Sequence, residues 1–149
     1  MKASRLIFTL LLASSVAVVQ LVAQQTKADR KPIEEVKVKA EAGDAESEVE
    51  LGLRYDKGAG VVKDHAEAAK WYRKAAEQNF AAAQDNLGIC YEYGRGVAED
   101  PVEAYKWVLL AARQGDEGAK KYITAMESIL LTPEQIARGQ KRAREFKPR

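Results

Sequence analysis

The sequence predicts an all-α fold: a short α/α solenoid of two tandem helix–turn–helix repeats with a cap helix at each end. Three observations predict it. A pattern of glycines, tryptophans and alanines recurs after 36 residues, apolar residues follow helical spacing within each unit, and helix-capping residues separate the helices. The 149 residues are 46% hydrophobic and 31% charged, which fits an ordinary folded domain and excludes a disordered or collagen-like chain.

The first residues have the layout of a secretory signal peptide. Lys2 and Arg5 precede the uncharged run LIFTLLLASSVAVVQLV, as a basic region precedes an apolar one in such signals. We predict cleavage after Ala23, with Ala17 as the alternative. An uncleaved membrane anchor is the competing interpretation, but the run falls short of the ~20 residues that a spanning helix needs. The mature protein is therefore expected in the periplasm or outside the cell, without stable membrane insertion.

The charge of the mature chain and its cysteine content narrow the possible partners. Loss of Lys2 and Arg5 with residues 1–23 would leave 22 basic residues against 22 acidic ones. A neutral chain has no electrostatic support for general nucleic-acid or membrane-surface binding. Cys90 is the only cysteine, so an intramolecular disulfide is excluded.

Before the repeats, the sequence predicts a tether and a helix. Residues 24–31 are expected to be a flexible tether. Residues 32–44, PIEEVKVKAEAGD, begin with a proline, which is favoured in the first turn of a helix. They predict a leading cap helix.

Residues 45–80 and 81–116 form the two predicted repeats, each of two helices. Their shared positions make a structural signature: Leu51, Gly52, Tyr55, Gly58, Gly60, Asp64, Trp71 and Ala75 in the first repeat, and Leu87, Gly88, Tyr91, Gly94, Gly96, Asp100, Trp107 and Ala111 in the second. The small residues predict close helix contact, with Gly52 facing Ala75 and Ala76, and Gly88 facing Ala111 and Ala112.

The segment between the two helices of a repeat predicts a capped turn. Gly58 is expected to end the first helix in a left-handed conformation. Asp64 is expected to open the second helix, in a capping box with Glu67. His65 is replaced by Pro101 in the second repeat, which indicates a structural position rather than a ligand or a general base. The paired glycines do not predict a phosphate site, because a helix precedes them and acidic residues follow.

These residues resemble a known family. The stretches LGLRYDKGAGVVKDHAEAAKWYRKAAEQN and LGICYEYGRGVAEDPVEAYKWVLLAARQG look like two Sel-1-like repeats, which are related to the tetratricopeptide repeat. The resemblance implies a protein-binding solenoid, commonly an adaptor, whose first helices line a concave groove. Some secreted, cysteine-rich members have been described as penicillin-binding or β-lactamase-like, but this chain lacks the paired cysteines of that branch.

The C-terminal part predicts an end to the solenoid. Residues 117–131 read as a degenerate first helix of a third repeat, and residues 132–149 as a basic cap helix that starts with the capping box of Thr132 and Gln135. Residues 34–56 carry a net charge of −5, and residues 136–149 one of +5. We interpret both as solvated helix faces, with weak self-association through these ends as the alternative.

The candidate site is a partner groove on the first helices. No serine, cysteine or histidine constellation points to catalysis, and neither a metal nor a cofactor site is predicted. Positions that differ between the repeats are free to serve recognition, and they predict groove residues Glu50, Arg54, Asn86, Cys90 and Tyr93. The predicted function is a non-enzymatic scaffold that binds a protein or peptide. The alternative is a secreted β-lactamase-like, penicillin-binding or cell-wall peptide hydrolase.

Overall fold

A computed structural model describes residues 32–149, and Ile33–Arg149 form one compact unit. The predicted signal peptide and tether lie outside the described residues. Among the residues described, no helix is both long and apolar enough to cross a membrane.

Helices account for nearly all of this unit. They are α2 (Ile33–Glu41), α3 (Ala45–Lys57), α4 (His65–Glu77), α5 (Ala81–Tyr93), α6 (Pro101–Arg113), α7 (Glu117–Ala125), a π-helical turn η1 (Met126–Leu130) and α8 (Pro133–Glu145). Residues 32–149 contain no strand. The predicted all-α class is confirmed.

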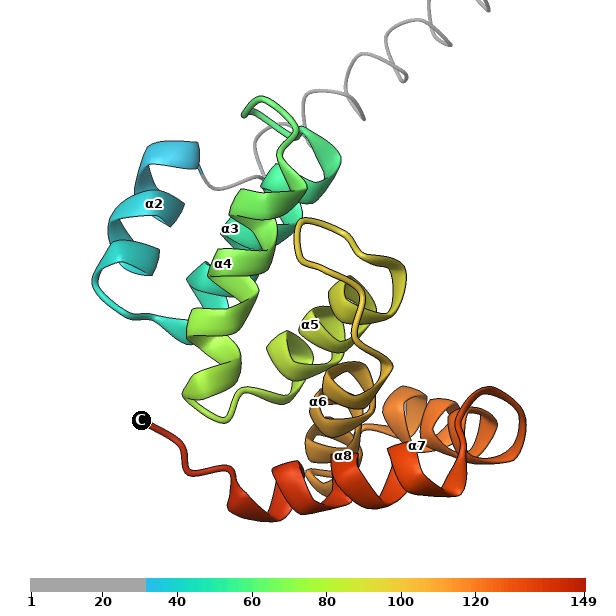
Figure 1. The fold of residues 1–149 in the computed structure, drawn as a ribbon. Coiled ribbons are helices and arrows are strands. Elements are labelled where there is room, and N and C mark those ends of the chain that lie inside the picture. Colours follow the sequence, from blue (N-terminus) through green and yellow to red (C-terminus); the bar gives the residue numbers. More distant parts are fainter. Residues whose placement is uncertain (1–31) are drawn as a thin grey trace, which may run out of the picture. The chain divides into compact units, whose positions relative to one another are not determined.

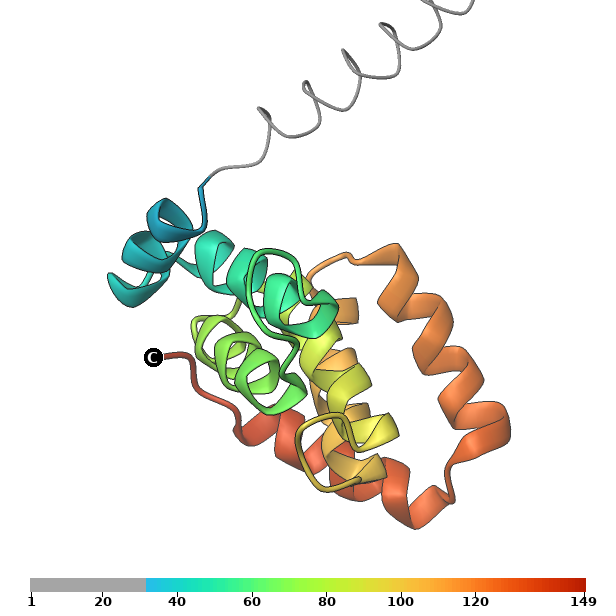
Figure 2. The same ribbon diagram turned by 90° about the horizontal axis from the view of Figure 1, so that it is seen from above.

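The helices pair as consecutive hairpins (Figures 1 and 2). α3 packs against α4, and α5 against α6, as the first and second helices of two repeats. Between the repeats, α4 packs against α5 in the way that α2 packs against α3 and α6 against α7. α2 therefore takes the place of a preceding second helix, and α7 that of a following first helix. The helical-solenoid architecture follows the predicted order.

The helix ends confirm most of the predicted capping. Gly58 and Gly94 adopt left-handed conformations (φ 70° and 62°). Asp64 accepts the backbone N–H groups of Ala66 and Glu67, and Asp100 does the same in the second repeat. One detail of the prediction is wrong: no reciprocal capping box forms, because the Asp64 N–H donates to the Tyr55 carbonyl at 2.9 Å. That bond ties the turn to the preceding helix instead.

A capping box does form at the start of α8. The side chain of Thr132 accepts the N–H of Gln135, and the Gln135 side chain accepts the N–H of Thr132. α8 then packs on α6 rather than on α7. It therefore covers the second helix of the second repeat, on the side away from the first helices. A Cβ on Gly139 would lie 2.5 Å from the Tyr105 ring, which shows how closely α8 and α6 approach.

Two contacts extend this docking along α8 and the chain end. The Arg142 guanidinium donates to Glu103 at 2.8 Å and lies 3.4 Å from Asp100. The backbone N–H of Arg149 donates to the Glu77 carbonyl at 2.9 Å, at the end of α4. Part of the basic C-terminal charge is thus paired within the chain.

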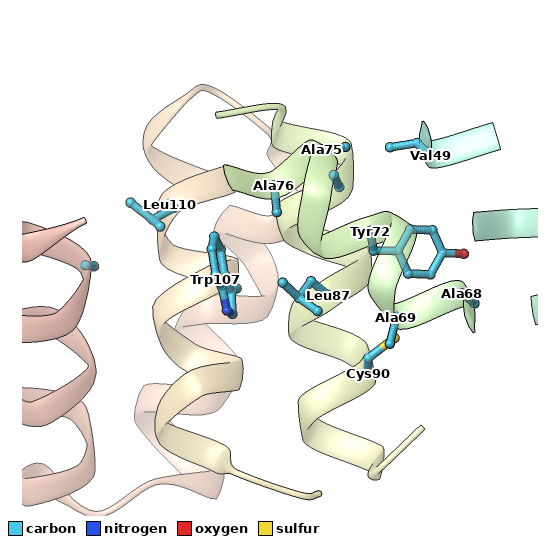
Figure 3. Close-up of a cluster of buried hydrophobic side chains, with 12 residues drawn as sticks. Val49, Ala68, Ala69, Tyr72, Ala75, Ala76, Leu87, Cys90, Trp107 and Leu110 are labelled. Carbon is cyan, nitrogen blue, oxygen red and sulfur yellow. The ribbon is translucent and has the colours of Figure 1, made fainter. Parts of the chain in front are cut away.

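The core continues from one repeat into the next (Figure 3). Leu87 of α5 is fully buried, together with Tyr72 of α4 and Trp107 of α6. Cys90 belongs to the same cluster and lies beside Ala69 of α4. Side chains from consecutive helices share this core, so each repeat buries its apolar faces against its neighbours.

The signature glycines sit at close helix contacts, but not opposite the predicted alanines. A Cβ on Gly52 would lie 2.6 Å from the Tyr72 ring, and one on Gly88 would lie 2.5 Å from Val108. The prediction that they face Ala75 and Ala76, and Ala111 and Ala112, is therefore wrong by one helical turn. A buried aromatic or branched side chain needs the space that a glycine leaves.

Replacing Gly88 with leucine should lower the free energy of unfolding by about 1–3 kcal/mol, because the added side chain overpacks the contact with Val108. Thr124 occupies the same position of the repeat in α7 and is exposed, so Thr124→Leu is the matched control. Urea denaturation followed by circular dichroism measures both. Equal losses in the two variants would contradict the close contact at Gly88.

Candidate functional site

A cavity lies between the first helices of the second repeat and of the degenerate third one. Its volume is about 340 Å³. Asp85, Ile89 and Tyr93 of α5 line one side, and Gly118 and Tyr122 of α7 line the other. Gly118 adds no side chain, so the space between the two helices stays open.

A second cavity of about 270 Å³ continues from the first toward the ends of the helices. Acidic and apolar residues line it: Glu92, Tyr93, Glu99, Pro101, Met126, Leu130 and Leu131. Tyr93 belongs to both linings, so we treat the two cavities as one groove and call it the α5–α7 groove. The side chain of Tyr93 is 61% exposed, which places its ring where a partner can reach it.

The helical repeat of α5 explains why these residues share the groove. Asp85, Ile89, Glu92 and Tyr93 follow the spacing i, i+4, i+7, i+8, which keeps them on one face of a helix. At the opposite wall, the turn η1 closes with a bond from the Leu131 N–H to the Met126 carbonyl. Met126 is buried in the core, whereas Leu130 is 55% exposed beside it in the lining. The groove therefore has an apolar rim.

The electrostatics of the groove are acidic. Burial raises the pKa of Asp85, and the nearby charge of Asp116 raises it further. Burial likewise raises the pKa of Glu92, with Glu99 adding to the effect. Each carboxylate thus lies in partly desolvated surroundings beside a second acid.

Replacing Asp85 with asparagine should raise the thermal midpoint at pH 7. A carboxyl group whose folded pKa is raised binds its proton more tightly in the folded state, so its ionisation destabilises the fold as the pH rises above the unfolded pKa. The gain should shrink as the pH falls toward about 4, the ordinary pKa of aspartate, and should be small below that pH, where the native residue is largely protonated in both states. Thermal melts at pH 7 and pH 3.5 measure this. A gain that is independent of pH would contradict the role of ionisation.

The structure brings one predicted groove residue into this site and leaves the others outside it. Tyr93 lines the groove. Asn86, one position from Asp85, instead donates to the carbonyl of Ala82 at 2.8 Å. On α3, the Arg54 guanidinium donates to Glu50 at 2.6 Å, and neither residue lines the two cavities.

Cys90 does not belong to an exposed face, so its predicted place in the groove is wrong. Its side chain is 3% exposed, and burial raises the pKa of the thiol to about 11. Arg54 has the same position in the first repeat, but its helix packs against α2, which begins only at Ile33. α4 has 13 residues against nine in α2, and Ala69 of α4 lies beside Cys90 in the core.

Most of the lining residues were missed at the sequence level, and Asp85 and Tyr122 show why. Asp85 differs from its repeat counterpart Val49 and could have been selected by that difference. Tyr122 aligns with Asn86, but it lies in the degenerate third unit, whose weak match to the repeats gave no reason to select it. Among residues 32–149, no group of three or more His, Cys, Asp or Glu residues is arranged to hold a metal ion.

Comparison with known proteins identifies the family. The Sel1 repeat model matches residues 45–80 and 81–116. A Sel1 repeat protein from Oxalobacter formigenes is 42% identical, with a TM-score of 0.61; the match covers 62% of this chain and 69% of that one. This chain belongs to the Sel1 repeat family.

Other relatives are longer or more distant. The chain is similar to c5321, a protective antigen of uropathogenic Escherichia coli, at 32% identity and a TM-score of 0.72; the match covers 76% of this chain and 24% of that one. The secretory immunoglobulin A-binding protein EsiB of E. coli O6:H1 is 44% identical over 43 residues, which are 29% of this chain and 9% of EsiB. Cysteine-rich protein B of Helicobacter pylori is 29% identical, with a TM-score of 0.58; the match covers 60% of this chain and 68% of that one. This chain therefore spans less than a quarter of the length of the first two.

Proposed function

We propose that this protein is an exported, non-enzymatic scaffold that binds a protein partner in the α5–α7 groove. The observation that carries the proposal is the exposed Tyr93 ring at the junction of the two cavities. Tyrosine gives a large contact area at low entropic cost and is frequent among residues that dominate binding energy. Membership of the Sel1 repeat family and the similarity to an immunoglobulin-binding protein support a protein partner.

The test is capture of a partner from an envelope extract. The bait is the mature chain from Gln24, compared with the same chain carrying Tyr93→Ala. Val62→Ala is the matched control, because Val62 is 88% exposed but lies outside the groove. We expect a protein that the wild type and Val62→Ala retain and that Tyr93→Ala loses. Equal retention by all three baits would contradict the groove as the binding site.

The enzymatic alternative is tested on the same material. Nitrocefin hydrolysis by the purified mature chain would favour a β-lactamase-like activity, and a rate equal to that of the buffer is the result expected for a scaffold. Fractionation of the source cells tests the export: recovery of the processed chain in the cytoplasm would contradict it.

A further inference from the structure

We propose that the partner segment bound by the α5–α7 groove is basic: an extended stretch of another protein in which two Lys or Arg residues, separated by short apolar residues, reach Asp85 and Glu92. This inference rests on the proposed function and deepens it. It comes from the chemistry of the groove, which combines acidic side chains, exposed aromatic rings and apolar walls.

In the described part of the chain, the acids of the groove form no salt bridge with a basic side chain. Among residues 32–149, no Lys or Arg forms a salt bridge with Asp85, Glu92 or Glu99. Elsewhere acids do find such partners, as Glu103 does with Arg142 at 2.8 Å. The groove thus keeps a concentration of unpaired negative charge next to apolar walls.

Unsatisfied oxygen atoms point to a hydrogen-bond donor. Within the described part of the chain, the Oε2 atom of Glu92 and the hydroxyl group of Tyr122 are buried without a hydrogen-bond partner, and both residues line the groove. Buried polar atoms without a partner are costly and call for an explanation. A carboxylate oxygen can only accept hydrogen bonds, so a donating cation satisfies Glu92 where an anionic or purely apolar ligand does not.

The rings and walls fit the aliphatic part of a basic side chain. Lys and Arg lay their methylene stems along apolar surface and keep the charged head at a polar group, and Ile89 offers such a surface beside Tyr93. A guanidinium already lies over the Tyr93 ring, because the Cζ atom of Arg95 is 5.4 Å from its centroid. The ring is therefore accessible to a cation, and Arg95 competes with a ligand for it.

The separation of the two acids sets the spacing of the ligand cations. Asp85 and Glu92 are seven residues apart on α5, which is about 10 Å along a helix. An extended peptide in the polyproline II conformation covers that distance in about three residues, at roughly 3.1 Å each, and its side chains at i and i+3 lie on the same face. The expected motif therefore has two basic residues about three positions apart, with the apolar residues between them near Ile89, which lies between Asp85 and Glu92 on α5.

The experiment measures binding of defined peptides by fluorescence anisotropy. The probe is a labelled octapeptide, Gly-Ser-Lys-Ala-Val-Lys-Ser-Gly, and its control has glutamine in place of both lysines. We expect the wild type to prefer the lysine peptide, with a preference that weakens as salt is added. Asp85→Asn combined with Glu92→Gln should reduce the affinity by about tenfold, an ordinary effect for interface charges.

Two further variants sharpen the result. Glu34→Gln with Glu41→Gln removes the same charge from an exposed face of α2 and should leave the affinity unchanged. Arg95→Ala removes the competing cation and should tighten binding of the lysine peptide. Equal binding of the lysine and glutamine peptides, or equal losses in the two double variants, would overturn the inference.

Three other outcomes would each overturn the basic-partner inference in a recognisable way. If no peptide binds while envelope capture still depends on Tyr93, the scaffold function stands and the basic character fails. If sedimentation without peptide shows a dimer that Arg138→Glu with Lys141→Glu on α8 disrupts, the occupant is a second copy of this chain. If the wild type neither captures a partner nor binds the lysine peptide, the groove is not a binding site.

Discussion

Replacing Gly96 with alanine should lower the free energy of unfolding by about 2–5 kcal/mol, one of the two largest losses that we expect from a single substitution. Gly96 has φ 71°, a left-handed conformation that costs an L-residue about 1–2 kcal/mol. A Cβ there would also overlap the backbone carbonyl of His65, and relieving such overpacking adds about 1–3 kcal/mol. The turn of the second repeat would have to leave the start of α4.

Gly60 supplies the matched control, because it has the same repeat position and a similar φ of 80°. Among residues 32–149, a Cβ on Gly60 would meet nothing within 4 Å, so Gly60→Ala should lose only the conformational part, about 1–2 kcal/mol. Denaturant unfolding of both variants separates the contact between repeats from the backbone strain. If the two losses are equal, the turn at Gly96 does not anchor one repeat to the other.

These two glycines also show what the sequence can and cannot predict about the fold. Their recurrence predicted a turn at both positions, and both are left-handed. The sequence could not assign Gly96 its contact with His65, because that contact depends on α4 being present beside the turn. At Gly60, the described part of the chain places no neighbour within 4 Å of the same point. A repeat pattern reports the shared backbone conformation, whereas the contacts differ at the end of the array.

The candidate site was predicted only in part, for a related reason. Comparing the repeats indicated the first helices and selected Tyr93. It also selected Cys90, because the comparison assumed that equal positions have equal surroundings. Each first helix packs against two neighbours, so a shift of one residue moves a side chain from the groove to the core. Ile89 lines the groove and the next residue, Cys90, lies in the core, and hydrophobic periodicity alone does not resolve such a shift.

The end of the solenoid illustrates the same limit. A third first helix was predicted from its apolar stripe, and α7 supplies it. Where α3 and α5 carry a glycine, α7 has the exposed Thr124, which donates to the Lys120 carbonyl at 3.1 Å. Thr124 therefore leaves no space for a helix to approach closely, as the glycines do in α3 and α5. α8 packs on α6 instead. The packing of α8 on α6 depends on the close contact of Gly139 with the Tyr105 ring. A pattern of residue types does not predict that contact.

Trp107 joins the repeat core to the C-terminal segment, and Trp107→Ala should lower the free energy of unfolding by about 3–5 kcal/mol. Its side chain is 5% exposed and meets Phe146 edge to face, with ring centroids 5.4 Å apart. Alanine would leave a cavity between α6 and the segment that follows α8. Because small domains have only about 5–15 kcal/mol of stability, guanidinium unfolding should show a greatly reduced midpoint.

Trp107→Phe tests whether packing rather than hydrogen bonding carries this effect. The indole N–H of Trp107 has no hydrogen-bond partner among the described residues, so phenylalanine removes no such bond and keeps an aromatic ring against Phe146. We expect Trp107→Phe to lose less than half of what Trp107→Ala loses. Phe146→Ala should lose part of the same energy, and combining it with Trp107→Ala should add less than the sum of the two, because contacting residues are not additive. Full additivity would mean that the ring contact does not hold the C-terminal segment on the repeat, and the cost of Trp107→Ala would then come from the core alone.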